Sequence, residues 1–164
     1  MLSSFFELLV QWDHKIFFLF NRTLANPVFD FVMPYVTDLR NTWWILVLGL
    51  GYFLFRCRSR AVKLILASCL VVSVTDSFNS RVVKEIFKRD RPPAALGETN
   101  VRLLVHSHSG RSFTSTHAAN SFGVATFLSL AFPPAAPFVF AVATLIAFSR
   151  VYVGVHFPLD VAAG

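Results

Sequence analysis

The stretch SFTSTHAANSFGVATFLSLAFPPAAPFVFAVATLIAFS, residues 112–149, contains 38 residues and no formal charge unless its one histidine is protonated. Pro133 and Pro134 divide the stretch, because proline ends or kinks a helix that it would otherwise interrupt. Each half is long and apolar enough to form a helix that packs against an apolar environment. The stretch therefore predicts a hairpin of two helices with almost no polar surface.

The composition of the whole chain indicates a membrane protein. The 164 residues are 55% hydrophobic, include 19 Phe and still carry a net charge of +6, an apolar share above that of ordinary soluble domains. A basic chain would also suit nucleic-acid binding, but the charge-free runs leave no soluble domain to perform it. We expect one membrane-embedded domain, residues 1–164, with no nucleic-acid partner, no cofactor and no obligate protein partner evident.

Further apolar segments surround the hairpin. Residues 42–56 and 61–84 favour two more membrane spans, although the charge-free core of the first is a little short for the hydrocarbon layer of about 30 Å. Residues 5–20 have apolar side chains at helical spacing, interrupted by charges, which is typical of an amphipathic helix in the membrane interface. A last helix begins at residue 158 or 159, and we expect it to be a span cut short at Gly164. The fold class is thus all-α, a multi-pass transmembrane bundle with an N-terminal interfacial helix.

Alternation of the spans across the membrane brings many polar side chains to one face. The residues gathered there are Lys84, Arg91, Ser115, His117, Arg150, His156 and Asp160. Three permanent cations suit the oxygens of a phosphoryl group, and the start of a helix adds neutral N–H donors. One histidine can attack phosphorus and the other can protonate the departing oxygen. Asp160 follows His156 by four residues and can fix the tautomer of that ring.

The hydroxyl-rich segment SFTSTH also has a simpler explanation. Ser and Thr commonly cap helix N-termini by accepting hydrogen bonds from free N–H groups, and helix ends in a membrane protein must be polar in any case. Considered alone, the segment favours this structural role. The convergence of the other charged groups at the same face favours a phosphate pocket, one wall of which is the capped helix.

Three motifs resemble those of the type 2 phosphatidic acid phosphatase superfamily, which also includes the vanadium haloperoxidases. The family pattern K-x6-RP is complete in Lys84-EIFKRD-Arg91-Pro92, and SR-x5-H-x3-D is complete in Ser149-Arg150-VYVGV-His156-FPL-Asp160. The middle motif PSGH is replaced by Thr114-Ser115-Thr116-His117. Thr114 loses the rigid backbone of proline, and Thr116 adds bulk where the family has glycine.

The resemblance implies His156 as a nucleophile that forms a phosphohistidine, His117 as general acid and Asp160 as the partner that orients the histidine. It implies phosphate binding by Lys84, Arg91, Ser115 and Arg150, without a metal. Members of the lipid branch remove phosphate from lipid phosphomonoesters or pyrophosphates. Candidate substrates are phosphatidylglycerophosphate, undecaprenyl pyrophosphate, lipid A 1-phosphate and phosphatidic acid. Two alternatives remain open: a lipid phosphotransferase using the same phosphohistidine, and a non-catalytic membrane scaffold.

The distribution of positive charge predicts the orientation in the membrane. Arg56, Arg58, Arg60 and Lys63 form a short basic loop with no acidic residue, opposite the polar face. Such loops stay in the cytoplasm. We therefore expect a bacterial inner-membrane protein whose active site faces the periplasm or the exterior.

Overall fold

The computed structural model describes residues 2–38, 55, 62–106 and 110–164. The expected span 42–56 and most of the basic loop that follows it lie outside these residues. Every regular element in the described ranges is helical.

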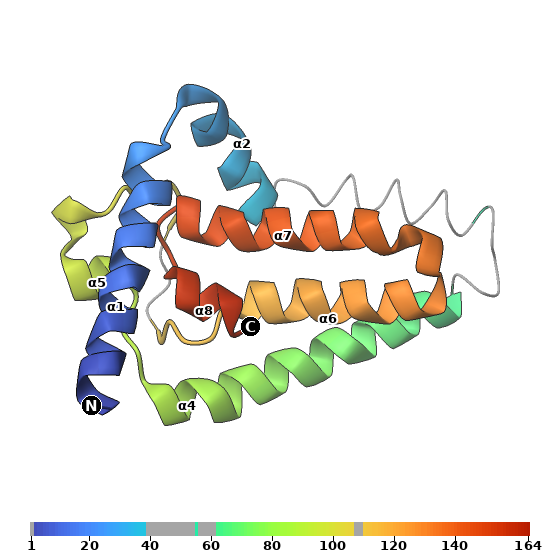
Figure 1. Ribbon diagram of the computed structural model, residues 1–164. Helices are drawn as coiled ribbons and strands as arrows, with labels where there is room; N and C mark the ends of the chain where they lie inside the picture. The colour runs from blue at the N-terminus through green and yellow to red at the C-terminus, as the bar shows by residue number, and fades with distance from the viewer. Residues whose placement is uncertain (1, 39–54, 56–61, 107–109) are drawn as a thin grey trace.

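The hairpin expected from the charge-free stretch is confirmed. Helix α6 covers Thr116–Ala131, a short 3-10 turn covers Pro133–Ala135, and helix α7 returns over Ala136–Tyr152. The two helices pack side by side along their whole length (Figure 1). The prolines end α6 and place Pro137 in the first turn of α7, where a missing N–H is harmless.

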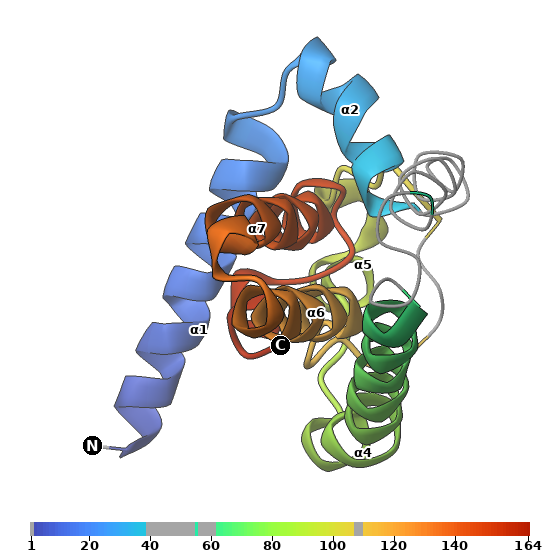
Figure 2. The ribbon, with the colours of Figure 1, turned by 90° about the vertical axis from the view of Figure 1, so that its right-hand side faces the viewer.

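A third long helix lies along α6 (Figure 2). Residues 62–78 are α-helical and continue into the π-helical turn η2 (Asn79–Val83) and α4 (Lys84–Phe87); we call residues 62–87 the long helix. It approaches α6 closely at Gly123, where an added Cβ would lie 3.2 Å from a methyl group of Val71. The expected span 61–84 is thus confirmed as a helix.

The exposed side chains of these helices are those of a membrane protein. Apolar residues recur every fourth position on the outside of the long helix, where Leu66, Leu70 and Phe78 are 60–65% exposed. Val62–Leu96 and Pro133–Tyr152 are long and apolar enough to cross a membrane, yet only 6% and 33% of their most apolar windows are buried within the protein. A core helix of a soluble protein would be mostly buried, so these outer faces suit lipid.

The N-terminal segment lies across one end of the hairpin. Helix α1 (Leu2–Phe18) crosses this end and is followed by the π-helical turn η1 (Leu19–Thr23) and by α2 (Pro27–Thr37), which packs on α7 (Figure 1). Asn26 caps α2 by accepting a hydrogen bond from Phe29 N at 3.0 Å. A helix that crosses the ends of the spans is oriented as expected for the interfacial helix of residues 5–20.

The loop between the long helix and α6 contains short helices that the sequence pattern does not indicate. They are α5 (Pro92–Leu96) and the 3-10 turn η3 (Glu98–Asn100). The final helix, α8 (Pro158–Ala162), begins at Pro158 as expected. The buried core gathers at this same end of the molecule, where Phe17 and Val101 pack against Phe157. The end of the bundle that carries the polar motifs is therefore also its best-packed part.

Candidate active site

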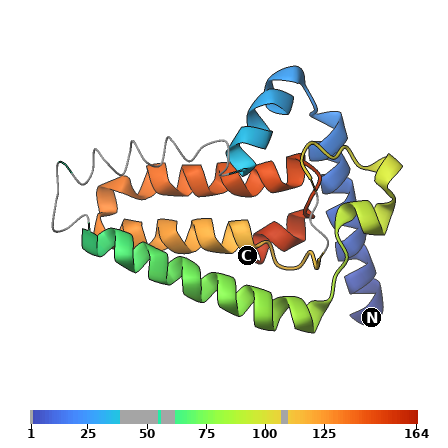
Figure 3. The same ribbon diagram turned by 180° about the vertical axis from the view of Figure 1, so that it is seen from behind.

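The seven residues singled out in the sequence come together at one end of the bundle, where α6 and α8 begin and α7 and the long helix end (Figure 3). His117 interacts electrostatically with Lys84, Arg91, Arg150 and His156, and Lys84 interacts with Asp160. The backbone N–H of Ser115 donates to the carbonyl oxygen of Asp160 at 2.8 Å. Three sequence segments thus form one site, as the alternation of spans predicts.

A buried histidine–aspartate pair occupies the centre of the site. His156 Nδ1 lies 3.5 Å from Asp160 Oδ2, and both side chains are almost completely inaccessible to solvent. The same carboxylate oxygen accepts a hydrogen bond from Phe157 N at 2.8 Å and another from Ser112 Oγ. Ser112 Oγ also lies 3.4 Å from His156 Nδ1. Nδ1 faces these groups, which makes Nε2 the candidate reacting nitrogen of the ring.

The surroundings of His156 favour its neutral form. Burial lowers the pKa of His156 to about 4, and the positive charges of Arg91 and Arg150 act in the same direction. The hydrogen bond to Asp160 opposes this shift without overcoming it. A neutral imidazole keeps its lone pair at physiological pH, which is the state that a nucleophile requires.

Two arginines present unused donors to the site. Arg91 Nε and Arg150 Nε are buried and lack a hydrogen-bond partner within the described residues. One other nitrogen of Arg150, Nη1, donates to Thr37 Oγ1 at 2.6 Å, which ties the guanidinium to α2. Buried donors without partners are rare because each costs about 1–3 kcal/mol. An anion bound between the two guanidinium groups would satisfy both.

The start of α6 is held by its own residues and by the long helix. Ser115 is the N-cap, and its side chain accepts a hydrogen bond from Ala118 N at 3.5 Å, as the sequence predicts for this segment. Asn79, in the π-helical turn η2, reaches the two threonines on either side of Ser115. Asn79 lies four residues after Thr75 and eight after Val71, which also face α6, so it is buried while its neighbour Phe78 is exposed.

The turn between α7 and His156 requires glycine. Gly154 has φ +86°, and a Cβ built on it would lie 2.6 Å from the carbonyl oxygen of Arg102. Asn21, fully buried, donates from Nδ2 at 2.8 Å to the carbonyl oxygens of both Arg102 and Tyr152. The backbone before His156 is thus fixed against two distant segments of the chain.

Several side chains that support the site were not identified from the sequence. They are Asp13, Thr37, Asn79, Arg89 and Ser112. Each acts through a contact that joins segments far apart in the chain. The available signals were weak: a carboxylate within an apolar helix for Asp13, and a place inside the dense cluster KRDRP for Arg89.

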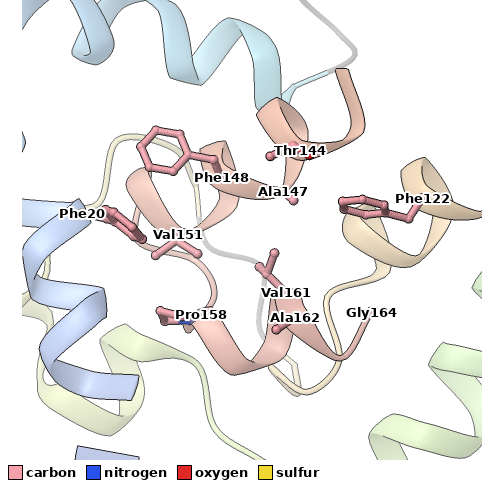
Figure 4. Close-up of a pocket in the computed structure, with 10 residues that line it drawn as sticks. All are labelled: Phe20, Phe122, Thr144, Ala147, Phe148, Val151, Pro158, Val161, Ala162 and Gly164. Carbon is pink, nitrogen blue, oxygen red and sulfur yellow. The ribbon is translucent and has the colours of Figure 1, made fainter. Parts of the chain in front are cut away.

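An apolar pocket of about 480 Å³ lies beside the site, between η1, α6, α7 and α8 (Figure 4). Phe20, Phe122 and Phe148 form much of its lining, and Thr144 supplies its single hydroxyl. None of the seven site residues lines this pocket. It therefore differs in character from the polar site.

The sequence is similar to a known family and to characterised relatives. The family model described as the PAP2 superfamily matches residues 60–164. A lipid A 4'-phosphatase of Bacteroides thetaiotaomicron is 29% identical over 96% of this chain and 72% of its own length. The lipid A 4'-phosphatase of Porphyromonas gingivalis is 27% identical over 96% of this chain and 69% of its own. Phosphatidylglycerophosphatase B of Bacillus subtilis is 30% identical over 86% and 70%.

Two solved structures share the fold. The crystal structure of Aquifex aeolicus LpxE is 32% identical and superposes with a TM-score of 0.64, covering 90% of this chain and 84% of that one. A transmembrane PAP2-type phosphatidylglycerolphosphate phosphatase from Bacillus subtilis is 27% identical, also with a TM-score of 0.64, covering 95% and 78%. The residues that match the family, 60–164, include all seven residues of the site described above.

Proposed function

Because the chain belongs to the PAP2 superfamily and is an integral membrane lipid phosphatase, we propose that it hydrolyses its substrate through a phosphohistidine on His156. The observation that carries this proposal is the buried His156–Asp160 pair beside two guanidinium groups, each with a buried nitrogen that finds no partner in the part of the chain that the structure describes. That arrangement combines a neutral nucleophile, His156, with two N–H donors, Arg91 Nε and Arg150 Nε, that a bound anion would satisfy.

The reaction has two steps. In the first, Nε2 of His156 attacks phosphorus and the bond from phosphorus to the lipid oxygen breaks, while His117 protonates that oxygen. In the second, His117 takes a proton from water, which attacks the phosphohistidine and releases inorganic phosphate. Asp160 accepts from Nδ1–H and stabilises the positive charge that the ring acquires.

Charge on the transferred group is neutralised by side chains. Lys84, Arg91 and Arg150 surround the phosphoryl oxygens, and Ser115 and the N–H groups at the start of α6 add neutral donors. Such donors act most strongly where water is excluded, because they are already oriented before charge develops. The burial of the Arg91 and Arg150 nitrogens supports this role.

The substrate that we propose first is a lipid A phosphate. Two relatives named lipid A 4'-phosphatase cover 96% of this chain, although the identity is below 30%. Phosphatidylglycerophosphate is the second candidate, favoured by the 30% identity to phosphatidylglycerophosphatase B. We further propose that the protein lies in the bacterial inner membrane with its site facing the periplasm. Lys63, the residue of the basic loop that the structure describes, lies in the first turn of the long helix, whereas Lys84 of the site lies near the other end of that helix.

The test is release of inorganic phosphate by the purified full chain from a panel of lipids. The panel holds lipid A 1-phosphate, lipid A 4'-phosphate, phosphatidylglycerophosphate, undecaprenyl pyrophosphate and phosphatidic acid. Loss of lipid phosphate without free phosphate would identify a phosphotransferase. No loss from any lipid would favour the non-catalytic scaffold.

Two variants then separate the roles of the histidines. His156→Ala should form no acid-labile, base-stable phosphoenzyme, whereas His117→Ala should still form one slowly from a substrate with a good leaving group. His106→Ala, in an exposed loop histidine, is the matched control and should retain activity. A phosphoenzyme trapped in the His156 variant would show that another residue is the nucleophile.

A further inference from the structure

We propose that Asp13, on the N-terminal helix α1, is a positioning residue for the reaction, acting through Arg89 on Asp160 and thereby on His156. This inference rests on the roles proposed above for His156 and Asp160. It adds a residue that lies outside the family match, which begins at residue 60.

One arginine joins two buried carboxylates. Arg89 Nη1 donates to Asp160 Oδ1 at 2.8 Å, and Nη2 of the same guanidinium donates to Asp13 Oδ2. The side chains of both aspartates are completely buried, and that of Arg89 is 22% exposed. A guanidinium has a rigid planar arrangement of donors, so it fixes the direction of each carboxylate as well as its distance.

Asp13 is also attached to the helix that carries Asp160. Its second oxygen, Oδ1, accepts a hydrogen bond at 2.8 Å from the backbone N–H of Leu159, in the first turn of α8. Both oxygens of Asp13 therefore contact groups that determine where Asp160 lies. Of these two contacts, only the one through Arg89 reaches the carboxylate that faces His156.

The charges explain why Arg89 without Asp13 would support catalysis poorly. Arg89 paired with Asp160 alone would cancel the negative charge that supports the imidazole as it becomes cationic. With Asp13 ionised, the set of Asp13, Arg89 and Asp160 keeps a net charge of −1. Arg89 can then orient Asp160 without removing its electrostatic support for His156, an effect that is strong in a buried site.

Helix α1 also packs against Phe157, the residue that follows the proposed nucleophile His156. The ring of Phe157 stacks on His14, with centroids 5.1 Å apart, and the guanidinium carbon of Arg89 lies 4.1 Å from the centre of the Phe157 ring. Phe17 packs against Phe157 from the same helix, at 5.3 Å. The opposite side of α1 exposes apolar residues such as Leu8 and Trp12. The helix therefore lies against the site end of the bundle on one side (Figure 3) and presents exposed apolar side chains on the other.

The experiment compares the wild-type full chain with Asp13→Asn in a phosphate-release assay. Asparagine keeps an oxygen for Leu159 N–H and nearly the same shape, but it removes the charge. We expect kcat to fall by about 10–100-fold, by analogy with the loss of groups that orient metal ligands in other sites, with KM within about twofold. The matched control is Glu7→Gln, which removes a charge from an exposed position of the same helix and should leave both constants unchanged.

A double-mutant cycle with Arg89→Gln tests whether Asp13 acts through Arg89. If it does, Asp13→Asn lowers kcat little further in the Arg89→Gln background. Asp13→Glu, which retains the charge, should recover part of the activity lost in Asp13→Asn. Wild-type kcat in Asp13→Asn, an equal loss in both backgrounds, or no recovery with Asp13→Glu would each overturn the inference.

The failure of this inference can be distinguished from failure of the proposed function. A wild-type chain that releases no phosphate from any lipid of the panel would overturn the proposed function and, with it, this inference. An active wild type, with the phosphoenzyme on His156 but an unaffected Asp13→Asn variant, would overturn this inference alone.

Discussion

Replacing Asn79 with alanine should weaken catalysis by releasing the segment before α6. Asn79 Nδ2 donates to the carbonyl oxygen of Thr114 at 3.4 Å and to Thr116 Oγ1 at 3.3 Å, while its Oδ1 accepts from Thr114 Oγ1 at 2.8 Å. The side chain is only 3% exposed. These threonines replace the proline and glycine of the family pattern PSGH. Asn79 thus supplies by hydrogen bonding a restraint that proline would supply through its fixed φ.

The magnitude follows from these three bonds. A typical hydrogen bond contributes about 1 kcal/mol net, and two of the three are long, so Asn79→Ala should cost about 2 kcal/mol. If all of that restraint serves to hold Ser115 and His117 in their reactive positions, the loss in kcat/KM is about 30-fold. The free energy of unfolding should fall by no more than the same amount.

The assay is phosphate release by the purified chain, with thermal unfolding measured in parallel. Thr114→Pro in the Asn79→Ala background should recover part of the lost activity, because proline restricts the same backbone directly. Thr75→Val is the matched control: it removes a hydrogen bond between the long helix and Asn120, away from the segment before α6. Activity of Asn79→Ala within twofold of wild type, or no recovery by Thr114→Pro, would refute the reasoning. An equal loss in Thr75→Val would attribute the effect to the bundle as a whole.

The remaining predictions concern the turn, the nucleophile, the charge of the site and the topology. Gly154→Ala should lower the thermal midpoint by several degrees and abolish phosphate release, because the added Cβ meets a backbone oxygen at 2.6 Å and φ is +86°; an unchanged midpoint would contradict this. As pH rises through about 4, kcat/KM should increase, because His156 must lose its proton to attack; a midpoint near 6.5, with the fold intact by circular dichroism, would exclude a lowered pKa. Activity should survive EDTA, since side chains supply the positive charge, and restoration of a lost activity by magnesium would disprove this. A membrane-impermeant maleimide should label Cys57, which lies outside the described residues, in inside-out vesicles but not in intact cells; labelling in intact cells would invert the topology.

The hairpin and the reacting groups could be predicted because their signals are local in the sequence. A run of 38 residues without formal charge, divided by Pro133 and Pro134, leaves few alternatives to two adjacent helices. His156 and Asp160 are only four residues apart, so their proximity was expected, but His156 precedes α8, and Asp160 reaches back toward it from the first turn of that helix, where it also accepts from Phe157 N. The convergence of the motifs required only that successive spans alternate in direction.

The supporting contacts could not be predicted because they depend on tertiary packing. Thr37 and Arg150 are separated by 113 positions, and Arg89 and Asp13 by 76. Neither spacing carries a periodic signal. Asn79 follows Thr75 by four residues on the face of the long helix that packs on α6, but its partners Thr114 and Thr116 lie 35 and 37 positions further along the chain.

The division between the residues proposed to contact phosphate and the residues that support them has a physical basis. The groups proposed to touch phosphate all lie within the segment that matches the family, residues 60–164. The N-terminal segment contributes none of them, yet Asp13, Asn21 and Thr37 contact Arg89, the backbone at Tyr152 and Arg150 respectively. Polar groups buried at the end of a membrane bundle must find partners there, because neither lipid nor the apolar core provides them. α1 and α2 provide those partners while presenting apolar residues outward, which makes them part of the working site as well as a means of attachment to the membrane.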